Sequence, residues 1–337
     1  MDTLTHIVVG ACIGEAILDV KIGRKALFVG AIAQSLPDID FVTATWMDTT
    51  HSLLAHRGFT HSILFVCLVA IGVPLLLHRF KSFKMITYRR WVIFWLIQLF
   101  IHIFLDAFNN YGVGWFEPFN HSRISFNAVY VADPFLSIWP GIAFFVLIFL
   151  HLKSKWRRWW GRFGIGMTIL YLIYATINKL TTDAAINRTL NHQKLSYNRY
   201  FSTPTPLNNW LWYVVVANDS GYYVGYRSVF EGKKPIRFEY FPRNANLLAA
   251  FPEKGDLDRL RRFSQGYYTV EQWNDTLVFN DLRFGQEIGW QEPRGRFAFH
   301  YYLNLPKENK LVVQRGRFAK WDKASVQTLI HRAFNIK

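Results

Sequence analysis

Cysteine and charged residues are scarce in this sequence. Only two of the 337 residues are cysteine, and both Cys12 and Cys67 lie within apolar runs. A disulfide scaffold is therefore excluded, and we expect both thiols to be buried as small hydrophobic groups. Charged residues make up 18% of the chain, against about 25% in an average soluble domain. Because hydrophobic residues make up 51%, the chain has enough apolar surface to fold, and disorder is excluded.

The shortage of charge is greatest in the first half of the chain. Residues 1–180 contain 16 Lys and Arg and 9 Asp and Glu, whereas residues 181–337 contain 23 and 14. Long apolar runs fill the first half, while aromatic and polar residues alternate in the second. We expect an α-helical multi-pass membrane domain of about six helices, some of them short, over residues 1–180. A smaller α+β, sheet-rich soluble domain should follow over residues 181–337.

Six apolar segments make up the expected membrane domain. A membrane span needs roughly 20 apolar residues, and four runs approach this length: Ser62–Leu77, Trp91–Leu105, Phe135–Leu152 and Phe163–Leu180. Two shorter runs precede them, Leu4–Leu18 and Ala26–Leu36. These two are expected either as short helices inside the bundle or as a re-entrant pair.

Basic residues predict the orientation of these segments. Of the 16 basic residues in the first half, 13 fall in three linkers, at residues 21–25, 79–90 and 153–162. Short loops rich in Lys and Arg stay cytoplasmic, and the three linkers share one side if all six segments cross. The C-terminal half would then be extracytoplasmic. The alternative is that these charges only bind anionic lipid.

Histidine and aspartate gather at the expected outward ends of the segments. Charged groups there are costly unless they are paired, hydrated or ligated, and a divalent cation accepts imidazole nitrogens and carboxylate oxygens together. We therefore predict a site for one or two divalent metal ions, with zinc as the expected metal. The predicted ligands are His6, Asp38, His56, His61, His102 and Asp106. The alternative is a set of ordinary hydrogen-bonded interfacial side chains and helix caps.

Local spacing gives further expectations for these residues. His102 and Asp106 are four apart, so a helix places both on one face. Asp38 and Asp40 follow a proline and should lie on a helix end or loop; an extended backbone would point both the same way. Gly58 indicates a turn, after which Thr60 is the candidate N-cap of the next helix.

Two residues of the same region are candidates for catalytic roles. Asp40 would be either a further ligand or the base that takes a proton from water. The planar guanidinium of Arg57 could hold an anionic substrate such as a phosphate. For Arg57, contact with a lipid headgroup or a salt bridge with Asp38 or Asp40 is an equal alternative.

The motifs of the first half resemble a known family. They are Met1-Asp2-Thr3-Leu4-Thr5-His6 with Gly10, Leu36-Pro37-Asp38-Ile39-Asp40, His56-Arg57-Gly58-Phe59-Thr60-His61-Ser62, and His102-Ile103-Phe104-Leu105-Asp106 with Asn110-Tyr111-Gly112. Together they resemble the membrane-bound metal-dependent hydrolases, some members of which are described as LexA-binding inner-membrane hydrolases. The resemblance implies a divalent-metal hydrolase in a bacterial plasma membrane. Over residues 181–337 it is limited mostly to Pro204-Thr205-Pro206-Leu207-Asn208.

The second half is expected to be rich in strands. Trp210–Val216 and Tyr222–Phe230 flank the turn signal at residues 218–221 and predict a β-hairpin. Further strands are expected at Ile236–Phe241, Thr276–Phe284, Arg296–Tyr302 and Leu311–Gln314, and helices at Leu257–Ser264 and Ala324–Phe334. The excess of basic over acidic residues in this half could attract anionic lipid or a cell-surface polymer. Nucleic acid is an unlikely partner, because no nucleic-acid-binding motif accompanies the charge.

Two classes of function remain open. The first is a membrane-bound metal-dependent hydrolase with its His/Asp site at the outer membrane face, acting on a phosphoester or lipid-linked substrate at the bilayer. The second is a non-catalytic membrane protein in which a metal or ion-pair cluster ties the helices together and the soluble domain binds a partner. A transporter is a weaker third class, because the acids collect near one surface and not at mid-depth.

Overall fold

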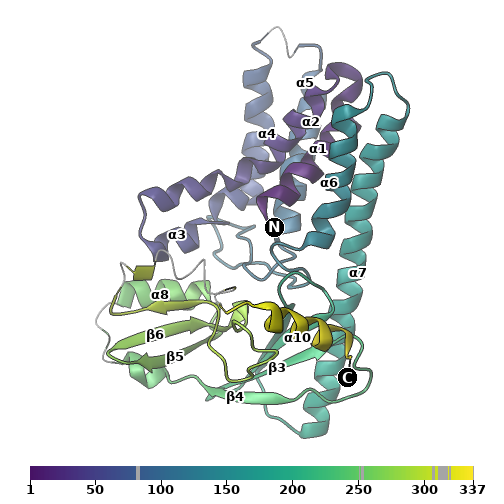
Figure 1. Ribbon diagram of the computed structural model, residues 1–337. Helices are drawn as coiled ribbons and strands as arrows, with labels where there is room; N and C mark the ends of the chain where they lie inside the picture. The colour runs from purple at the N-terminus through teal and green to yellow at the C-terminus, as the bar shows by residue number, and fades with distance from the viewer. Residues whose placement is uncertain are drawn as a thin grey trace. The chain divides into compact units, whose positions relative to one another are not determined.

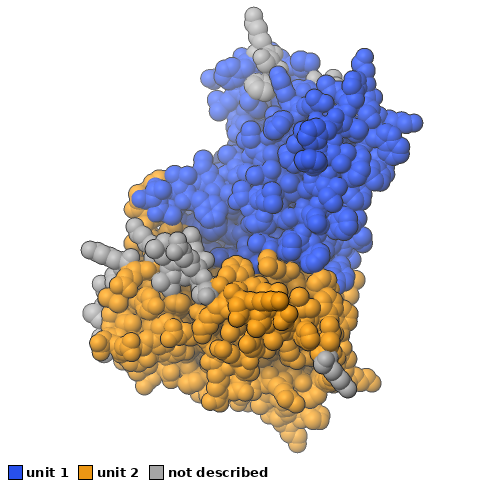
Figure 2. Space-filling model, in the orientation of Figure 1, with its two compact units in different colours: residues 1–45, 55–175 blue, residues 46–54, 176–337 orange. Residues whose placement is uncertain are grey.

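The computed structural model describes residues 1–80, 84–249, 251, 254–305, 308–309, 318 and 320–336. The chain divides into two compact units, coloured separately in Figure 2. Unit 1 comprises Met1–Thr45 and Ala55–Ala175, and unit 2 comprises Trp46–Leu54 and Thr176–Lys337. The predicted domain boundary at Leu180 falls inside a helix that contributes residues to both units.

Unit 1 is built from helices, and each of the six predicted apolar segments forms one. The helical elements are α1 (Thr3–Ile22), α2 (Lys25–Ser35), the 3₁₀ helices η1 (Leu36–Thr45) and η2 (Phe59–His61), α4 (Ile63–Leu77), α5 (Tyr88–Asp106), α6 (Pro134–Phe149) and the first part of α7 (Trp156–Gln193) (Figure 1). The prediction of a helical N-terminal region with several apolar helices is confirmed.

Glycines allow α1 and α2 to pack with their backbones nearly touching. A Cβ added to Gly30 would lie 2.1 Å from the Gly10 oxygen, and one added to Gly14 would lie 2.2 Å from the Ala26 oxygen. Only residues without a side chain permit this approach. The close packing fixes the register of α1, which carries His6, against α2, which leads directly into the aspartates of η1.

Several helices of unit 1 are suited to a membrane. By length and composition, three helical stretches among the described residues could cross one: Lys25–Thr45, Tyr88–Asp106 and Trp156–Gln193. Thr49–His61 and Ile63–Leu77, bent by 55°, would add a fourth if they form one broken span, and Thr3–Leu18 and Pro134–Phe149 are shorter apolar helices. Large apolar side chains such as Leu75, Phe145 and Ile173 are exposed on these helices, as expected for surfaces that face lipid.

Two local predictions for unit 1 are wrong. Cys67 is exposed, whereas Cys12 is buried as expected; Cys67 lies on an outer face of α4, where an apolar run need not be buried in protein. Thr60 is not the N-cap of α4, because the 3₁₀ turn η2 continues through His61. Ser62 is the cap, and its hydroxyl accepts a hydrogen bond from the Phe65 nitrogen.

Unit 2 contains two antiparallel sheets. The first has the order β1 (Arg199–Pro204), β2 (Leu211–Ala217), β3 (Gly221–Ser228) and β4 (Phe238–Pro242), and the second has the order β5 (Tyr268–Trp273), β6 (Thr276–Asp281) and β7 (His300–Tyr302). The rest of α7, the short α3 (Thr49–Ala55), α8 (Lys254–Phe263) and α10 (Lys323–Phe334) complete the described elements of this unit, together with two short 3₁₀ turns. The predicted sheet-rich second half is confirmed.

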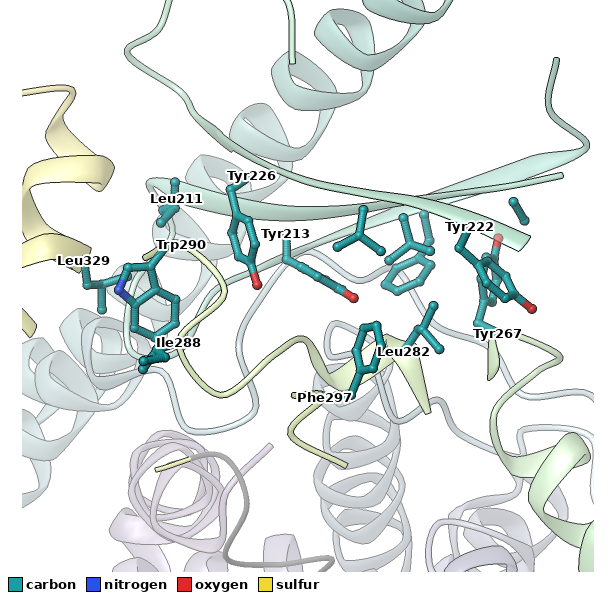
Figure 3. Packing of buried hydrophobic residues seen from close by; sticks show 14 of the residues in the cluster. Leu211, Tyr213, Tyr222, Tyr226, Tyr267, Leu282, Ile288, Trp290, Phe297 and Leu329 are labelled. Atoms are coloured by element: carbon teal, nitrogen blue, oxygen red, sulfur yellow. The ribbon is translucent and has the colours of Figure 1, made fainter. Parts of the chain in front are cut away.

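Buried side chains cover both faces of the first sheet, with one cluster around Tyr213 and Tyr226 and another that packs Val214 and Val216 against α7. Tyr213 and Tyr226 of the predicted β2–β3 hairpin pack with Leu282 and Trp290 from the segment after β6 (Figure 3). The strand predicted at Thr276–Phe284 ends at Asp281, because the carboxylate of Asp281 caps a 3₁₀ turn over Leu282–Phe284. The strands β1 and β5 were not predicted, and the strand expected at residues 311–314 lies outside the described residues.

Candidate metal centre

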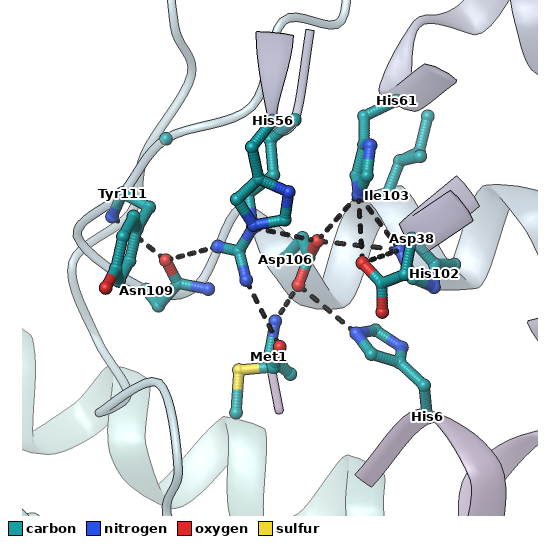
Figure 4. Close-up of polar contacts among 12 residues, drawn as sticks. Met1, His6, Asp38, His56, His61, His102, Ile103, Asp106, Asn109 and Tyr111 are labelled. Atoms are coloured by element: carbon teal, nitrogen blue, oxygen red, sulfur yellow. Dashed lines mark hydrogen bonds and ion pairs between the residues drawn. The ribbon is translucent and has the colours of Figure 1, made fainter. Parts of the chain in front are cut away.

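Four side chains predicted as ligands meet at one point in unit 1. Nε2 of His61 lies 3.1 Å from Nε2 of His102. Asp106 Oδ2 lies 3.2 Å from the first nitrogen and 3.5 Å from the second. Asp38 Oδ1 lies 3.5 and 3.6 Å from the same two atoms (Figure 4). The four ligand atoms therefore form one compact group.

Both histidines of this group are oriented by partners at their other ring nitrogen. Nδ1 of His61 lies 3.2 Å from Asp40 Oδ2, and Nδ1 of His102 lies 2.5 Å from the Gln34 backbone oxygen. These acceptors favour the tautomer with the proton on Nδ1 and leave the lone pair of Nε2 toward the group of four. Carboxylate and carbonyl partners of this kind are typical of metal-ligating histidines.

The helices explain how distant residues meet. His102 and Asp106 lie one turn apart at the end of α5, as the spacing of four predicts. Asp38 and Asp40 lie in η1, a 3₁₀ helix with about three residues per turn, so residues two apart point in different directions. Asp38 consequently faces Nε2 of His61, while Asp40 faces the Nδ1 side of the same ring.

Asp106 is held by further contacts outside the group of four. Its Oδ1 lies 3.2 Å from Nε2 of His6 and contacts the Met1 nitrogen. The ring of His6 stacks on that of His102, with centroids 3.8 Å apart. His6 is therefore adjacent to the group, bonded to one ligand and stacked on another, but it is not among the four atoms that converge.

Arg57 lies buried beside Asp106. Its Nε is 3.4 Å from Asp106 Oδ2, and its other nitrogens donate to the side chain of Asn109 at 2.7 Å and to the Met1 oxygen at 3.1 Å. The ring of Tyr111 lies 5.1 Å from the guanidinium carbon. Arg57 therefore forms an ion pair with Asp106, while its backbone nitrogen donates to Asp40.

His56 and Asp40 form a separate pair next to the group. Nδ1 of His56 lies 2.9 Å from Asp40 Oδ1. The other oxygen of Asp40 accepts from the Arg57 backbone nitrogen at 2.9 Å and from the Thr60 hydroxyl at 2.7 Å. His56 is 18% exposed, whereas the side chains of His61 and His102 are fully buried. His56 is therefore more accessible to solvent than either histidine of the group of four.

The donor set fits a divalent cation. Zinc binds imidazole nitrogen and carboxylate oxygen at about 2.0–2.2 Å in tetrahedral sites, which places neighbouring ligand atoms about 3.3 Å apart. The separations of 3.1–3.6 Å match this spacing. Asp38 Oδ2 and Asp106 Oδ2 are buried and accept no hydrogen bond from the described residues. Asp106 Oδ2 lies 3.4 Å from Arg57 Nε, and Asp38 meets the histidines through Oδ1. The convergence of two imidazole nitrogens and two carboxylates is therefore the feature that favours a cation here.

Other acidic and histidine residues of unit 1 are engaged elsewhere. Glu15 pairs with Arg157 at 2.7 Å, both buried, and His121 pairs with Glu117. Asp133 caps α6 and accepts a hydrogen bond from the Tyr171 hydroxyl at 2.6 Å.

Sequence reasoning missed the residues that support the site. Gln34 contributes through its backbone oxygen, which no side-chain pattern identifies. Asn109 bridges to Arg57, and the only signal was its place directly before the quoted Asn110-Tyr111-Gly112 motif. Thr60 was interpreted as a cap, but its hydroxyl donates to Asp40.

The fold and the site together define a membrane protein whose helices enclose a buried His/Asp cluster of the metal-ligand type. Residues 1–181, just over half of the chain, match the family described as YdjM inner membrane protein. The chain belongs to this family, which is one of inner membrane proteins.

Two relatives extend the comparison. The uncharacterized protein YfhP of Bacillus subtilis (strain 168) is 31% identical over 305 residues, which cover 84% of this chain and 87% of YfhP. The inner membrane protein YbcI of Escherichia coli (strain K12) is 32% identical over 122 residues, or 36% of this chain and 69% of YbcI. No solved structure matches the chain. The similarity to YfhP therefore includes much of unit 2, whereas the family match covers mainly unit 1.

Proposed function

We propose that this protein is a metal-dependent hydrolase of the bacterial inner membrane. The observation that carries the proposal is the pair of Nε2 atoms of His61 and His102, 3.1 Å apart and flanked by two carboxylates. Asp38, His61, His102 and Asp106 would hold the ion, with His6 behind Asp106. Zinc suits a set of two nitrogens and two oxygens. A zinc ion held there would lower the pKa of a coordinated water toward 7 and polarise a substrate oxygen. For this, the water would have to enter as a fifth ligand or replace one of the two carboxylates.

The Asp40–His56 pair would accept the proton of the attacking water. Asp40 holds the imidazole through Nδ1 at 2.9 Å, which leaves Nε2 of His56 as the free basic atom. The partial exposure of His56 supports this role, because a proton acceptor needs a route to solvent. The buried charge of Arg57 lies beside the same centre and would favour an anionic substrate such as a phosphoester.

A groove on unit 1 supports a substrate that carries a hydrocarbon chain. The cavity has a volume of about 640 Å³ and is lined mainly by apolar residues of α1 and α6, among them Leu4, Val8, Ile138 and Phe145. Leu4 and Val8 share one face of α1, whereas His6 lies two residues from each and points to the opposite, buried side. The groove therefore borders the same helix as the metal centre but lies on its other face. A lipid-linked ester or phosphoester is the substrate class that we propose.

The distribution of basic residues supports a topology in which all six apolar segments cross and unit 2 is extracytoplasmic. A reporter that fluoresces only in the cytoplasm, fused to the C-terminus, should then be dark. A bright fusion at equal protein level would contradict this topology.

A second candidate is a structural metal site. It is favoured by the burial of His61, His102 and Asp106, whose side chains are 0% exposed, because structural zinc sites are closed. In that case metal would be present and stability would depend on it, but no hydrolysis would accompany it.

The test combines metal analysis with activity. The chain purified in detergent should contain a stoichiometric divalent metal by plasma mass spectrometry, and His102→Ala should lose it while His51→Ala, at an exposed histidine paired with Asp48, keeps it. Hydrolysis of bis-p-nitrophenyl phosphate or of a phospholipid panel should require the metal, and His56→Ala should lose activity but keep the metal. Metal without any hydrolysis would favour the structural role, and metal-free wild type would refute both.

A further inference from the structure

A second concave site lies in unit 2, within the described residues of that unit alone. It has a volume of about 640 Å³ and is lined by β3, the loop between β3 and β4, residues 289–293 and the end of α10. A volume of this size is in the range of small-molecule binding pockets, about 300–1,000 Å³. The residues that line it differ from those of the groove on unit 1, because basic side chains are prominent among them.

The acids of this pocket are already paired, whereas two of its cations are not. Glu231 forms an ion pair with Arg332 at 3.0 Å, and Glu239 forms one with the neighbouring Arg294 at 3.0 Å. Lys234 and Arg237 also line the pocket, both are exposed, and neither contacts a carboxylate of the described residues. The lining therefore carries three basic and two acidic side chains, and Lys234 and Arg237 are its cations without a carboxylate partner among the described residues.

The segment that carries Lys234 is held in place by a buried arginine. Arg227 is 2% exposed, and its guanidinium donates to the Lys234 oxygen at 2.7 Å and to the Gly232 oxygen at 2.5 Å. Gly225 lets the β4 backbone come close, because an added Cβ would lie 2.6 Å from the Arg237 oxygen. Both unpaired cations are thus attached to an ordered backbone, as expected of a built site.

Aromatic rings form another part of the lining. Tyr226 and Trp290 line the pocket, and their polar atoms are already bonded, to the Gln286 side chain at 3.2 Å and to the Ser325 oxygen at 3.1 Å. Both rings are largely buried in the core cluster of unit 2, with Tyr226 9% and Trp290 6% exposed, so they border the pocket but present little surface to a ligand.

We propose that this pocket binds a phosphorylated ligand with a small polar body, such as a sugar phosphate. Lys234 and Arg237 would bind the phosphate through charge-assisted hydrogen bonds, and Glu239 and Asn335, which also line the pocket, would hydrogen-bond the polar body. The same phosphate could be free in solution or belong to a phospholipid headgroup. The proposal does not rest on the hydrolase function, so a variant without the metal should bind equally well.

The test uses calorimetry with the full-length chain in a polyoxyethylene-ether detergent. Glucose 6-phosphate should bind, and glucose should bind at least about tenfold more weakly because it lacks the charge. The double variant K234A/R237A should lose at least about tenfold in affinity. Lys233→Ala removes a single positive charge one residue from Lys234 and outside the pocket lining, and should leave the affinity within about twofold.

A second arm distinguishes the sources of phosphate. Binding of the chain to phosphatidylglycerol vesicles, but not to phosphatidylcholine vesicles, with the same dependence on Lys234 and Arg237 and no response to glucose 6-phosphate, would assign the pocket to a lipid headgroup. The proposal is overturned if the wild type binds neither probe, if glucose binds as well as its phosphate, or if Lys233→Ala weakens binding as much as K234A/R237A. His102→Ala should bind as the wild type does, which separates this result from failure of the metal centre.

Discussion

The Nε2 atoms of His61 and His102 face each other at 3.1 Å although the residues are 41 positions apart in the chain. The Nδ1 atom of each ring lies against an acceptor, so the neutral rings have no proton at Nε2 to share. Two lone pairs at this distance repel, and two adjacent carboxylates add negative charge at the same point. A bound cation would relieve both unfavourable interactions.

Removal of metal should therefore destabilise the protein. At a free zinc concentration about a thousandfold above Kd, binding adds about 4 kcal/mol to the free energy of unfolding. We expect EDTA to lower the midpoint of thermal unfolding in detergent, and added Zn²⁺ to restore it. The measurement is a thermal scan of the wild type with and without chelator.

His102→Ala is the control for this effect. With the ligand removed, its unfolding midpoint should lie below that of the wild type and should not move with EDTA. An equal chelator response in His102→Ala and wild type would show that the ion binds elsewhere.

The glycine contact between α1 and α2 gives a second prediction. A methyl group on Gly30 would meet the Gly10 oxygen at 2.1 Å, and overpacking of this kind costs about 1–3 kcal/mol or more. Gly30→Ala should lower the free energy of unfolding and also the metal content, because it would force α1, which carries His6, away from α2, which leads into Asp38 of η1. Gly72→Ala in α4 meets nothing within 4 Å and should be neutral or slightly stabilising, since alanine favours helix. Equal behaviour of the two variants would refute the packing argument.

The sequence could predict those contacts of the site that depend on local structure alone. The i, i+4 pair of His102 and Asp106 depends only on the helix, and it was predicted. Asp38 and Asp40 contact opposite sides of the His61 ring because η1 is a 3₁₀ helix. An extended segment would have pointed both carboxylates the same way. Sequence alone had left that segment open between a helix end and a loop.

The same distinction applies to the sheets of unit 2. The β2–β3 hairpin carries its own turn signal, and Val214 and Val215 mark a buried strand. The strand β1 ends at Pro204 next to a Pro-Thr-Pro sequence that is typical of a loop. It is a strand because β2 pairs with it along its whole length, and this tertiary contribution cannot be read from propensity.

The buried ion pair of Glu15 and Arg157 gives a third prediction. Their side chains are each 1% exposed and meet at 2.7 Å, so removal of one partner leaves an uncompensated buried charge. Glu15→Ala should lower the free energy of unfolding by about 3–5 kcal/mol. Double replacement by leucine should cost less than the sum of the single replacements, which a double-mutant cycle would measure. His121→Ala, at a residue 60% exposed, should change it by less than about 1 kcal/mol.

Asp133 gives a prediction of pH dependence. Burial raises the pKa of its carboxyl to about 6, from an ordinary value of 3.8, although hydrogen bonds from the Tyr171 hydroxyl and the Phe135 nitrogen oppose this shift. Because the folded protein holds this proton more tightly than the unfolded chain, the stability contributed by the proton is full below about pH 4 and is lost as the pH rises through 6. Asp133→Asn stays neutral throughout, and its amide can still bond both partners. From pH 4 to 7 we expect the free energy of unfolding of Asp133→Asn to rise relative to the wild type by up to about 3 kcal/mol. Parallel unfolding curves for the two proteins over this range would mean that Asp133 is already ionised in the folded protein at pH 4.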